Sequence, residues 1–305
     1  MLVSGLTIIR NGIRLDYPFI EAIRSALPIC DEYIVVVGDC EDGTREAVEA
    51  LREPKIRIVD THWSKFVTPQ ECLLAQQTNI GVNLARGRWC LTMQGAEVLH
   101  ERDLPRLRAL MEAHADDKRV EGMLFERLTF WADYDHVLAV YPWLFKYTPR
   151  IVRCGIGAHS IRDAMSFAVF DRWSTRGRYP RCIDTGAYMY RYSDVRDIQV
   201  LERKLRESAH GNPAWKIDSA HFLTRVPRGF VRRHLGGHPE VMGERIAKFP
   251  KQYDENDPRC RTQFSAREWM RILETRLYHA TGLPRWRNSR FKLVEDLVSK
   301  PNRPR

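Results

Sequence analysis

Polar side chains stand directly after several short apolar runs of this 305-residue sequence. They are Asn11, Asp39, Asp42, Gln94 and Glu97. Carboxylate and amide oxygens accept hydrogen bonds from the hydroxyl and N–H groups of a bound molecule. Because ligands of open α/β sheets bind beyond the carboxyl ends of the strands, these side chains would meet at one edge of such a sheet. Their positions predict a single ligand-binding crevice.

The elements that would position these side chains alternate along the first hundred residues. The predicted strands are 6–9, 33–37, 55–59 and 89–93, and the predicted helices between them are 17–27, 45–52 and 70–85. The run 33–37 is continuous and apolar, which is typical of a strand covered on both faces. Strands that alternate with helices at this spacing predict a mostly parallel α/β sheet covered by helices.

The pattern changes after Phe125, where aromatic and polar residues become frequent. Further strands are predicted at 150–153 and 188–192, a charged helix near 195–208, and basic amphipathic helices at 264–279 and 290–299. Trp269, Leu273 and Leu277 line one face of the first basic helix. We therefore divide the chain into a domain of residues 1–205 and a basic, largely helical extension of residues 206–305.

Composition narrows the class of protein. With 44% apolar and 29% charged residues the chain can bury a sizeable core, which excludes a disordered, collagenous or disulfide-scaffold protein. The formal charge of +10 is concentrated in residues 261–305, which hold eleven Lys and Arg against four Asp and Glu. Seven cysteines without a CxxC pair favour reduced thiols in a cytoplasmic enzyme. The apolar run 33–37 is far too short to span a bilayer, and residues 1–10 lack the pattern of a secretory signal.

Several common motifs are absent. No GxGxxG follows the first predicted strand, and neither a Walker A pattern nor an HExxH occurs, so we expect no site of these kinds. His234 and His238 are four residues apart, but the two glycines between them argue against a helix and no third ligand is near. We interpret both as solvated loop histidines.

Three segments, 4–12, 31–44 and 84–101, resemble in order and spacing the motifs of family 2 glycosyltransferases of the GT-A fold. Segments 161–167 and 190–196 are similar to later parts of that family. The resemblance implies a GT-A-like, Rossmann-type sheet and an enzyme of polysaccharide biosynthesis. It also implies a nucleotide-sugar donor bound across the ends of the first, second and fourth strands, and a glycan or lipid-linked glycan as acceptor.

The resemblance assigns the base and ribose of the donor to the turns after the first two strands. A carboxylate suits this task because it accepts hydrogen bonds from a ribose diol or a uracil imide. The expected donor-binding residues are Ile9, Arg10, Asn11, Asp39, Asp42, Asn79, Gln94 and Glu97. A second interpretation of the triplet 42–44 stays open, because Asp and Thr also form turns and cap helices.

The end of the fourth strand departs from the family. Relatives usually place an Asp-x-Asp or a Gln-Ala-Asp-Glu there, so that a carboxylate can hold Mn²⁺ or Mg²⁺ against the diphosphate. This sequence reads Gln94-Gly-Ala-Glu97, so the expected aspartate aligns with Ala96 and Glu97 is the one metal candidate. Where relatives carry a histidine that completes the metal site, this chain has Arg191.

An arginine can neutralise a diphosphate as a metal ion does. We therefore expect a metal-independent or weakly metal-dependent transferase in which Arg191 replaces the metal. An arginine from a second group would assist it: Arg225, Arg228, Arg232 and Arg233. Two alternatives stay open, namely a divalent cation at the site and Arg191 as a solvated strand residue.

An inverting transfer also needs a base for the proton of the acceptor hydroxyl. Asp163 is the first candidate because its segment resembles the family's Asp-Ala-x-x-Phe, and Asp135 is the second. Either could instead cap a helix or pair with an arginine. Aromatic residues after the donor region form an acceptor platform or pack in the core. They are Phe130, Trp131, Tyr134, Tyr141, Trp143, Phe145 and Tyr147.

Other functions compete with glycosyl transfer. The missing aspartate also fits a degenerate GT-A domain that binds nucleotide or glycan without turnover. The positive charge suggests nucleic acid, but a basic face with interleaved aromatic residues is poorly developed, so we expect no such partner. The basic helices fit better with an anionic membrane surface, or they pack on the catalytic domain with charged faces in water. We expect a cytoplasmic protein, at the inner face of the membrane in the first case.

Overall fold

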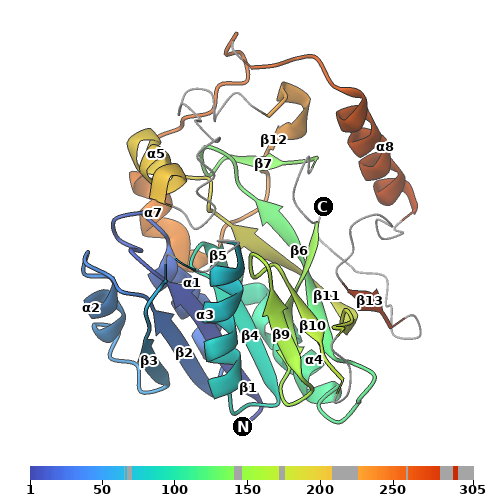
Figure 1. Ribbon diagram of the computed structural model, residues 1–305. Coiled ribbons are helices and arrows are strands. Elements are labelled where there is room, and N and C mark those ends of the chain that lie inside the picture. Colours follow the sequence, from blue (N-terminus) through green and yellow to red (C-terminus); the bar gives the residue numbers. More distant parts are fainter. Residues whose placement is uncertain are drawn as a thin grey trace.

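The computed structural model describes residues 1–64, 66, 71–140, 146–171, 176–207, 226–258, 260–281 and 291–294. A central sheet with helices on both faces forms the body of the molecule (Figure 1). Its strands run in the order β13-β11-β6-β8-β4-β1-β2-β3, and β5 joins β11 at one end. They are β1 (Val3–Ile9), β2 (Glu32–Val37), β3 (Ile56–Asp60), β4 (Trp89–Gln94), β5 (Glu97–Val98), β6 (Gly122–Thr129), β8 (Tyr147–Arg153), β11 (Arg181–Arg191) and β13 (Lys292–Leu293).

Most strands of this sheet point the same way. β1 is parallel to both β2 and β4, β2 is parallel to β3, and β6 is parallel to β11. β8 lies antiparallel between β4 and β6. The carboxyl ends of β1, β2, β4 and β11 therefore lie along one edge, and the predicted mostly parallel sheet covered by helices is confirmed.

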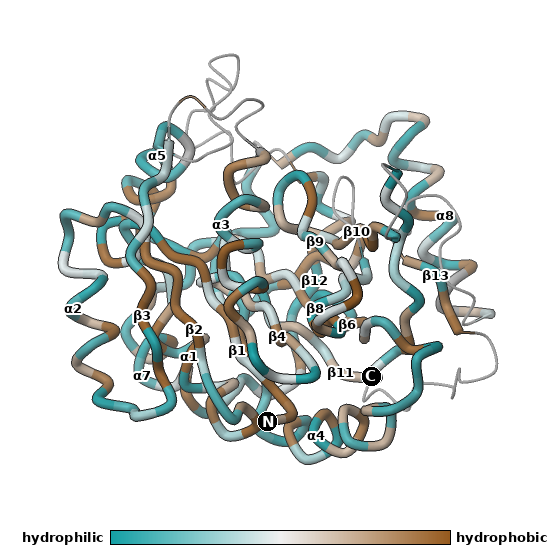
Figure 2. Tube along the Cα trace, turned by 60° about the horizontal axis from the view of Figure 1, so that its bottom comes forward, coloured by the Kyte–Doolittle hydropathy of each residue, from teal (hydrophilic) through white to brown (hydrophobic). Residues whose placement is uncertain are grey.

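Two apolar layers hold the helices to the sheet. α1 (Phe19–Ala26), α2 (Thr44–Glu49) and α4 (Leu104–Ala113) pack on one face, against side chains such as Tyr33 and Val35. α3 (Glu71–Leu84) and the hairpin of β9 (Ala158–Ile161) and β10 (Ser166–Val169) pack on the other face, against Ile34 and Val36. All six residues of β2 are buried, as its continuous apolar run predicts. The hydropathy colouring of Figure 2 shows the same concentration of apolar residues in β1 and β2.

Several shorter strands and helices lie outside the central sheet. β7 (His136–Leu138) pairs with β12 (Val231–Arg233) beside the carboxyl ends of the main strands. The remaining helices are α5 (Ile198–Glu207), α7 (Gly243–Lys248) and α8 (Ala266–Thr281), and the 3-10 turns are Leu27–Ile29, Glu101–Asp103, Arg228–Phe230 and Glu240–Met242. Met242 is part of the core beneath α1, and Arg245 pairs with Asp16 and Glu21. Residues 226–249 thus pack on the first domain, while the division after residue 205 stays a prediction.

The structure differs from the sequence analysis in several places. β6 and the helix α4 lie where no element was expected, and β11 begins seven residues before the predicted strand 188–192. Within the predicted helix 290–299, Lys292 and Leu293 form a strand that pairs with β11, and the other positions lie outside the described residues except 291 and 294. No helix among the described residues is long and apolar enough to cross a membrane.

Candidate active site

The turns after β1 and β2 are locked together by hydrogen bonds. The backbone N–H of Asn11 donates to Sγ of Cys40 (3.2 Å), and that of Glu41 donates to Oδ1 of Asn11 (3.4 Å). Asn11 has a positive φ of 50°, a conformation that asparagine tolerates better than most residues. Ile9 ends β1 as a buried residue, and its carbonyl accepts the N–H of Gly38. The sequence prediction that these turns meet is confirmed.

Asp42 fastens this pair of turns to α2. Its Oδ1 accepts both the hydroxyl (2.6 Å) and the backbone N–H (3.1 Å) of Thr44, and its Oδ2 accepts the N–H of Arg14 (2.7 Å). Burial by itself raises the pKa of Asp42, but these hydrogen bonds outweigh it and hold the pKa below its usual value. Gly43 is the N-cap of α2 and no side chain caps the helix, so the triplet 42–44 forms a turn in which Asp42 bonds the first residue of the helix.

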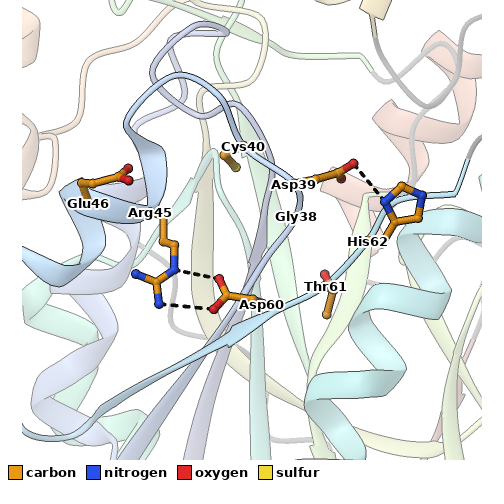
Figure 3. A pocket seen from close by; sticks show the side chains of 8 residues that line it. All are labelled: Gly38, Asp39, Cys40, Arg45, Glu46, Asp60, Thr61 and His62. Carbon is orange, nitrogen blue, oxygen red and sulfur yellow. Dashed lines mark hydrogen bonds and ion pairs between the residues drawn. The ribbon is translucent and has the colours of Figure 1, made fainter.

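Asp39 remains more open. It lines a pocket of about 430 Å³ between the ends of β2 and β3, which we call the donor pocket. The pocket is lined by Gly38, Asp39, Cys40, Arg45, Glu46, Asp60, Thr61 and His62. Figure 3 shows Asp39 directed toward His62, whose Nδ1 lies 3.1 Å from Oδ2. The side chain of Asp39 is 41% exposed.

The surroundings of Asp39 keep it ionised. Its Oδ1 accepts the N–H of Trp63 (3.1 Å) and lies 3.4 Å from Nε of Arg10. Burial raises the pKa of Asp39, but the Trp63 hydrogen bond and the charge of Arg10 outweigh it and lower the pKa. Gly38 leaves room for the side chain of Trp63, because a Cβ at residue 38 would lie 2.7 Å from its indole ring. Asp39 is thus an ionised, partly exposed carboxylate that lines the pocket.

The opposite wall of the donor pocket is closed by an ion pair. Arg45 donates from Nε (2.8 Å) and Nη2 (3.2 Å) to the two oxygens of Asp60. This bidentate contact fixes a second carboxylate in the pocket but neutralises it. Asp60 is thus held by two nitrogens of one arginine, whereas a single nitrogen of Arg10 lies 3.4 Å from Asp39.

The end of β4 is built in another way. Glu97 is fully buried, and its Oε1 lies 2.6 Å from Nη2 of Arg150, which is itself only 1% exposed. Its Oε2 accepts the N–H of Gln94 (3.0 Å). Burial raises the pKa of Glu97, but the charges of Arg150 and Arg127 outweigh it and keep the carboxyl ionised with a lowered pKa. We call Gln94, Glu97 and Arg150 the fourth-strand end.

These residues do not fit a divalent cation. Both oxygens of Glu97 are engaged, the next side chain is Ala96, and its main chain is occupied, because its carbonyl accepts the N–H of Tyr192. Among the described residues no group of three or more His, Cys, Asp and Glu is placed to hold a metal ion. A carboxylate neutralised by a buried arginine has little left to offer a metal. We therefore derive no step through a metal ion.

Asp163 lies in the turn of the β9–β10 hairpin, directly over the fourth-strand end. The carbonyl of Ala164 accepts Nη1 of Arg150 (2.8 Å), and the sulfur of Met165 lies 3.7 Å from the side-chain amide of Gln94. The hairpin itself is tied to α3 by Asn79, whose amide bonds both the N–H (2.7 Å) and the carbonyl (3.0 Å) of Ser160. The side chain of Asn79 therefore holds this hairpin in place.

Arg191 reaches the same region from β11. In the pairing of β5 with β11 it stands opposite Glu97. Its Nη1 lies 2.6 Å from Oδ2 of Asp194, a carboxylate that it shares with Lys204 at 3.7 Å. The side chain is 14% exposed, so Arg191 is not a solvated strand residue.

The other expected arginines lie elsewhere. Arg232 and Arg233 are exposed on β12 and Arg228 is in the turn before it, whereas Arg225 lies outside the described residues. A cation that the sequence analysis overlooked is Arg196, which is 1% exposed. It donates to the carbonyl of Leu15 (3.0 Å) and stacks on Tyr17 at 4.5 Å. No hydrogen-bond partner for its Nε and Nη2 exists among the described residues.

Asp135 belongs to a different part of the molecule. It pairs with Lys251 at 2.8 Å, and this partner lowers its pKa. The more deeply buried neighbour is Asp133, which accepts hydrogen bonds from the N–H groups of Gln252 and Tyr253 and was not singled out from the sequence. Asp133 therefore anchors the segment after α7.

The aromatic residues after β6 are mostly core. Phe130, Trp131 and Tyr134 are at most 4% exposed, so the packing interpretation is confirmed for them. Tyr147 is half-buried against Phe291, and Tyr141, Trp143 and Phe145 lie outside the described residues.

His234 and His238 are not solvated. Both rings pack on Phe130, at 5.0 and 4.8 Å, and Nδ1 of His238 lies 2.9 Å from the hydroxyl of Tyr192. Burial lowers the pKa of His238 to about 4, helped by the nearby charge of His234. The loop prediction holds, but the exposure predicted for both side chains is wrong.

The similarity of this chain to known proteins is low. No family model and no curated protein matches the chain. The crystal structure of S. aureus TarS is 14% identical, with 72% of this chain covering 41% of TarS at a TM-score of 0.38. The crystal structure of TarS 1–349 is 16% identical, and the match covers 50% of this chain and 47% of that one at a TM-score of 0.32.

A third structure is glucosyl-3-phosphoglycerate synthase from Mycobacterium tuberculosis with Mn²⁺, uridine diphosphate and phosphoglyceric acid. It is 14% identical, with 42% of this chain covering 43% of that one at a TM-score of 0.30. The chain thus spans less than half the length of each of these proteins. The assignment of the fold rests on the sheet itself, whose strand order and single antiparallel interior strand give this chain a GT-A-like α/β fold.

Proposed function

We propose that this protein is a glycosyltransferase that moves a sugar from a nucleotide-sugar donor to a glycan or lipid-linked glycan acceptor, with inversion and without a metal ion. The observation that carries the proposal is the donor pocket, which opens at the carboxyl ends of β2 and β3 and presents the ionised Asp39. In open α/β sheets this edge is where ligands bind. The resemblance of segments 4–12 and 31–44 to the family assigns the same edge to the nucleotide.

The pocket suits a nucleoside in size and chemistry. Its volume of about 430 Å³ lies in the range of small-molecule sites. Asp39 accepts hydrogen bonds from a ribose diol or a base imide, and Arg10 beside it holds the carboxylate in place. Asn11 and Asp42 shape the turns, so we assign them to positioning and Asp39 to contact.

Arginines take the place of the metal at the diphosphate. Negative charge builds on the departing nucleoside diphosphate, and fixed guanidinium groups stabilise it without rearranging. Arg191 and Arg196 are the candidates, since both stand at the carboxyl end of β11 and Arg196 keeps two nitrogens without a partner among the described residues. We propose that Glu97 and Arg150 serve as a rigid floor beneath them.

Asp163 is the proposed base. Its carboxylate takes the proton of the acceptor hydroxyl while the hydroxyl oxygen bonds to the anomeric carbon. The bond from that carbon to the diphosphate oxygen breaks, and the electron pair leaves with the nucleoside diphosphate. The position of the hairpin turn over Gln94 and Arg150 supports this role, whereas the ion pair with Lys251 leaves Asp135 as second choice.

Donor binding is tested by a thermal-shift panel of UDP-, GDP-, CMP- and dTDP-sugars, each with Mn²⁺ and with a chelator. A ligand that binds only the folded state raises the melting temperature. We expect one nucleotide class to stabilise the protein equally with and without Mn²⁺. No shift with any donor would remove the basis of the proposal.

Turnover is tested with Asp163→Asn. We expect donor binding to persist and product formation to fall at least about 100-fold, the usual contribution of a general base. Asp171→Asn is the matched control, because Asp171 follows the same hairpin and its side chain is 65% exposed. The competing function, a degenerate domain that binds nucleotide or glycan, predicts binding without product in the wild-type protein.

A further inference from the structure

The outermost described helix, α8, carries its apolar side chains on the outside. Trp269 is 50% exposed, Met270 48%, Leu273 55% and Leu277 63%. With spacings of one, three and four residues, these side chains fall on one face of the helix. We call Trp269, Met270, Leu273 and Leu277 the outer face of α8.

Several polar side chains of α8 are less exposed than its outer face. Glu268 is held by Arg261, Arg271 pairs with Glu274 at 2.9 Å, and Thr275 is buried. Between them Ile272 joins the small apolar cluster around Phe230. A surface helix normally turns its apolar stripe to the core, whereas α8 exposes most of its large apolar side chains to water.

The position of α8 leaves its outer face accessible. Figures 1 and 2 both place α8 at the periphery, on the opposite side of the molecule from α2. A contiguous apolar patch of this kind on a protein surface marks an interaction site. The question is which partner it fits.

The charge around the outer face selects the partner. Arg267 and Arg276 flank the apolar side chains, are exposed, and have no carboxylate partner among the described residues. The segment 261–305 adds to this, with eleven Lys and Arg against four Asp and Glu. An apolar stripe with a tryptophan, bordered by arginines, is what a helix needs to lie in the interface of an anionic bilayer.

We propose that α8 docks the protein on an anionic lipid surface, with Trp269, Met270, Leu273 and Leu277 inserted among the acyl chains and Arg267 and Arg276 at the headgroups. The inference does not depend on glycosyl transfer. Such docking would bring the sheet close to the lipid-linked acceptor of the proposed function.

Cosedimentation of the full chain with vesicles tests this. We expect binding to phosphatidylcholine vesicles that contain phosphatidylglycerol, weaker binding to phosphatidylcholine alone, and release as salt shortens the Debye length. Leu273→Glu with Leu277→Glu should lower the partition coefficient roughly tenfold or more. Arg267→Gln with Arg276→Gln should lower it roughly fivefold per arginine, and only on the anionic vesicles.

Matched controls separate the helix from the rest of the surface. Leu235→Glu changes a leucine that is 89% exposed outside α8, and Arg24→Gln changes an exposed arginine of α1, so neither should alter partitioning. Unchanged thermal unfolding of all variants shows that they fold. Vesicles should also shift the tryptophan emission of the wild type to the blue. Trp269→Phe should remove the emission that shifts.

Two outcomes overturn the proposal. One is a wild-type chain that binds no vesicle of either composition. The other is a dimer in sedimentation velocity that Leu273→Glu with Leu277→Glu converts to a monomer without any loss of lipid binding. In that case the outer face of α8 is a contact between two copies of this chain.

Discussion

The donor pocket and the fourth-strand end lie on the same edge of one sheet, yet they treat a carboxylate in opposite ways. Asp39 is 41% exposed and ionised beside a cavity. Glu97 is fully buried, and the guanidinium of Arg150 neutralises its charge. An exposed carboxylate can exchange water for a ligand, whereas a buried and paired one is part of the framework.

The difference shows why residue type alone does not define a site. Both acidic residues follow a buried parallel strand, and both stand where ligands bind. What separates them is the neighbour: Asp39 meets Arg10 at 3.4 Å on the surface, and Glu97 meets Arg150 at 2.6 Å in the interior. The fourth-strand end is a buried, paired support, and the function proposed above therefore assigns the diphosphate to arginines.

The largest expected effect is that of Glu97→Gln on stability. Removal of one partner leaves Arg150 as an uncompensated buried charge, which costs about 3–5 kcal/mol. Urea unfolding measures the loss. Glu112→Gln, which breaks an exposed pair with Arg108, should cost about 1 kcal/mol or less. If Glu97→Gln unfolds like the wild type, Glu97 is not part of the framework and is free for a ligand.

Asp39→Asn should have the opposite profile. The loss of a charge-assisted hydrogen bond to the nucleotide weakens donor affinity about 10- to 100-fold, with little change in stability. Isothermal titration with the nucleotide identified in the thermal-shift panel measures this. Asp60→Asn is the control in the same pocket, because Arg45 already neutralises Asp60. Equal losses in the two variants would contradict a special role for Asp39.

Asp42→Ala separates a structural role from ligand contact. The variant loses the hydrogen bonds from Asp42 to Thr44, at the start of α2, and to Arg14, so we expect about 1 kcal/mol of lost stability and only a small change in affinity. Chemical denaturation and nucleotide titration are read together. Glu41→Ala, at the exposed neighbouring position, should change neither. A collapse of affinity at unchanged stability would mean that Asp42 binds the nucleotide directly.

A last effect concerns the pH dependence of stability and His238, whose ring packs on Phe130. The pKa of His238 is about 4 in the fold, below the ordinary value of about 6.5, because the ring is buried. As the pH falls, the unfolded chain therefore binds this proton before the folded chain does. The stabilisation contributed by neutral His238 is full above pH ~6.5 and is lost as the pH falls toward 4. His238→Gln should flatten the dependence of the unfolding free energy on pH over this window. Leu235→Gln, in the same loop, should keep the wild-type slope, and an unchanged slope for His238→Gln would refute the assignment.

Much of the fold follows from local pattern. The run 33–37 is short and continuously apolar and the run 89–93 is apolar except for Thr92, which is typical of strands buried on both faces. β6 was missed because its polar members, such as Glu126 and Arg127, are buried in pairs and networks that depend on distant residues. The helix α4 begins at Leu104, one residue before a proline, and has only a modest apolar stripe, so its pattern is weak.

The site was predictable in part. The meeting of the turns at Asn11 and Asp39 follows from parallel strand ends, which sequence pattern can locate. The pairing of Glu97 with Arg150 could not be foreseen, because 53 residues separate them and only the register of β8 against β4 brings them together. Arg196 was overlooked because its burial comes from Tyr17 in a distant turn.

The central claim is that Arg191 takes the role of a metal ion at the diphosphate. It is tested most directly by turnover with and without a chelator, in the wild type and in Arg191→Ala. The account predicts that the wild type keeps its activity in EDTA and gains little from Mn²⁺. Arg191→Ala should lose about 100-fold or more, the usual cost of one fixed donor at a developing charge, and Arg24→Ala should lose nothing. A wild type that works only with Mn²⁺, or an Arg191→Ala variant with full activity in EDTA, would contradict it.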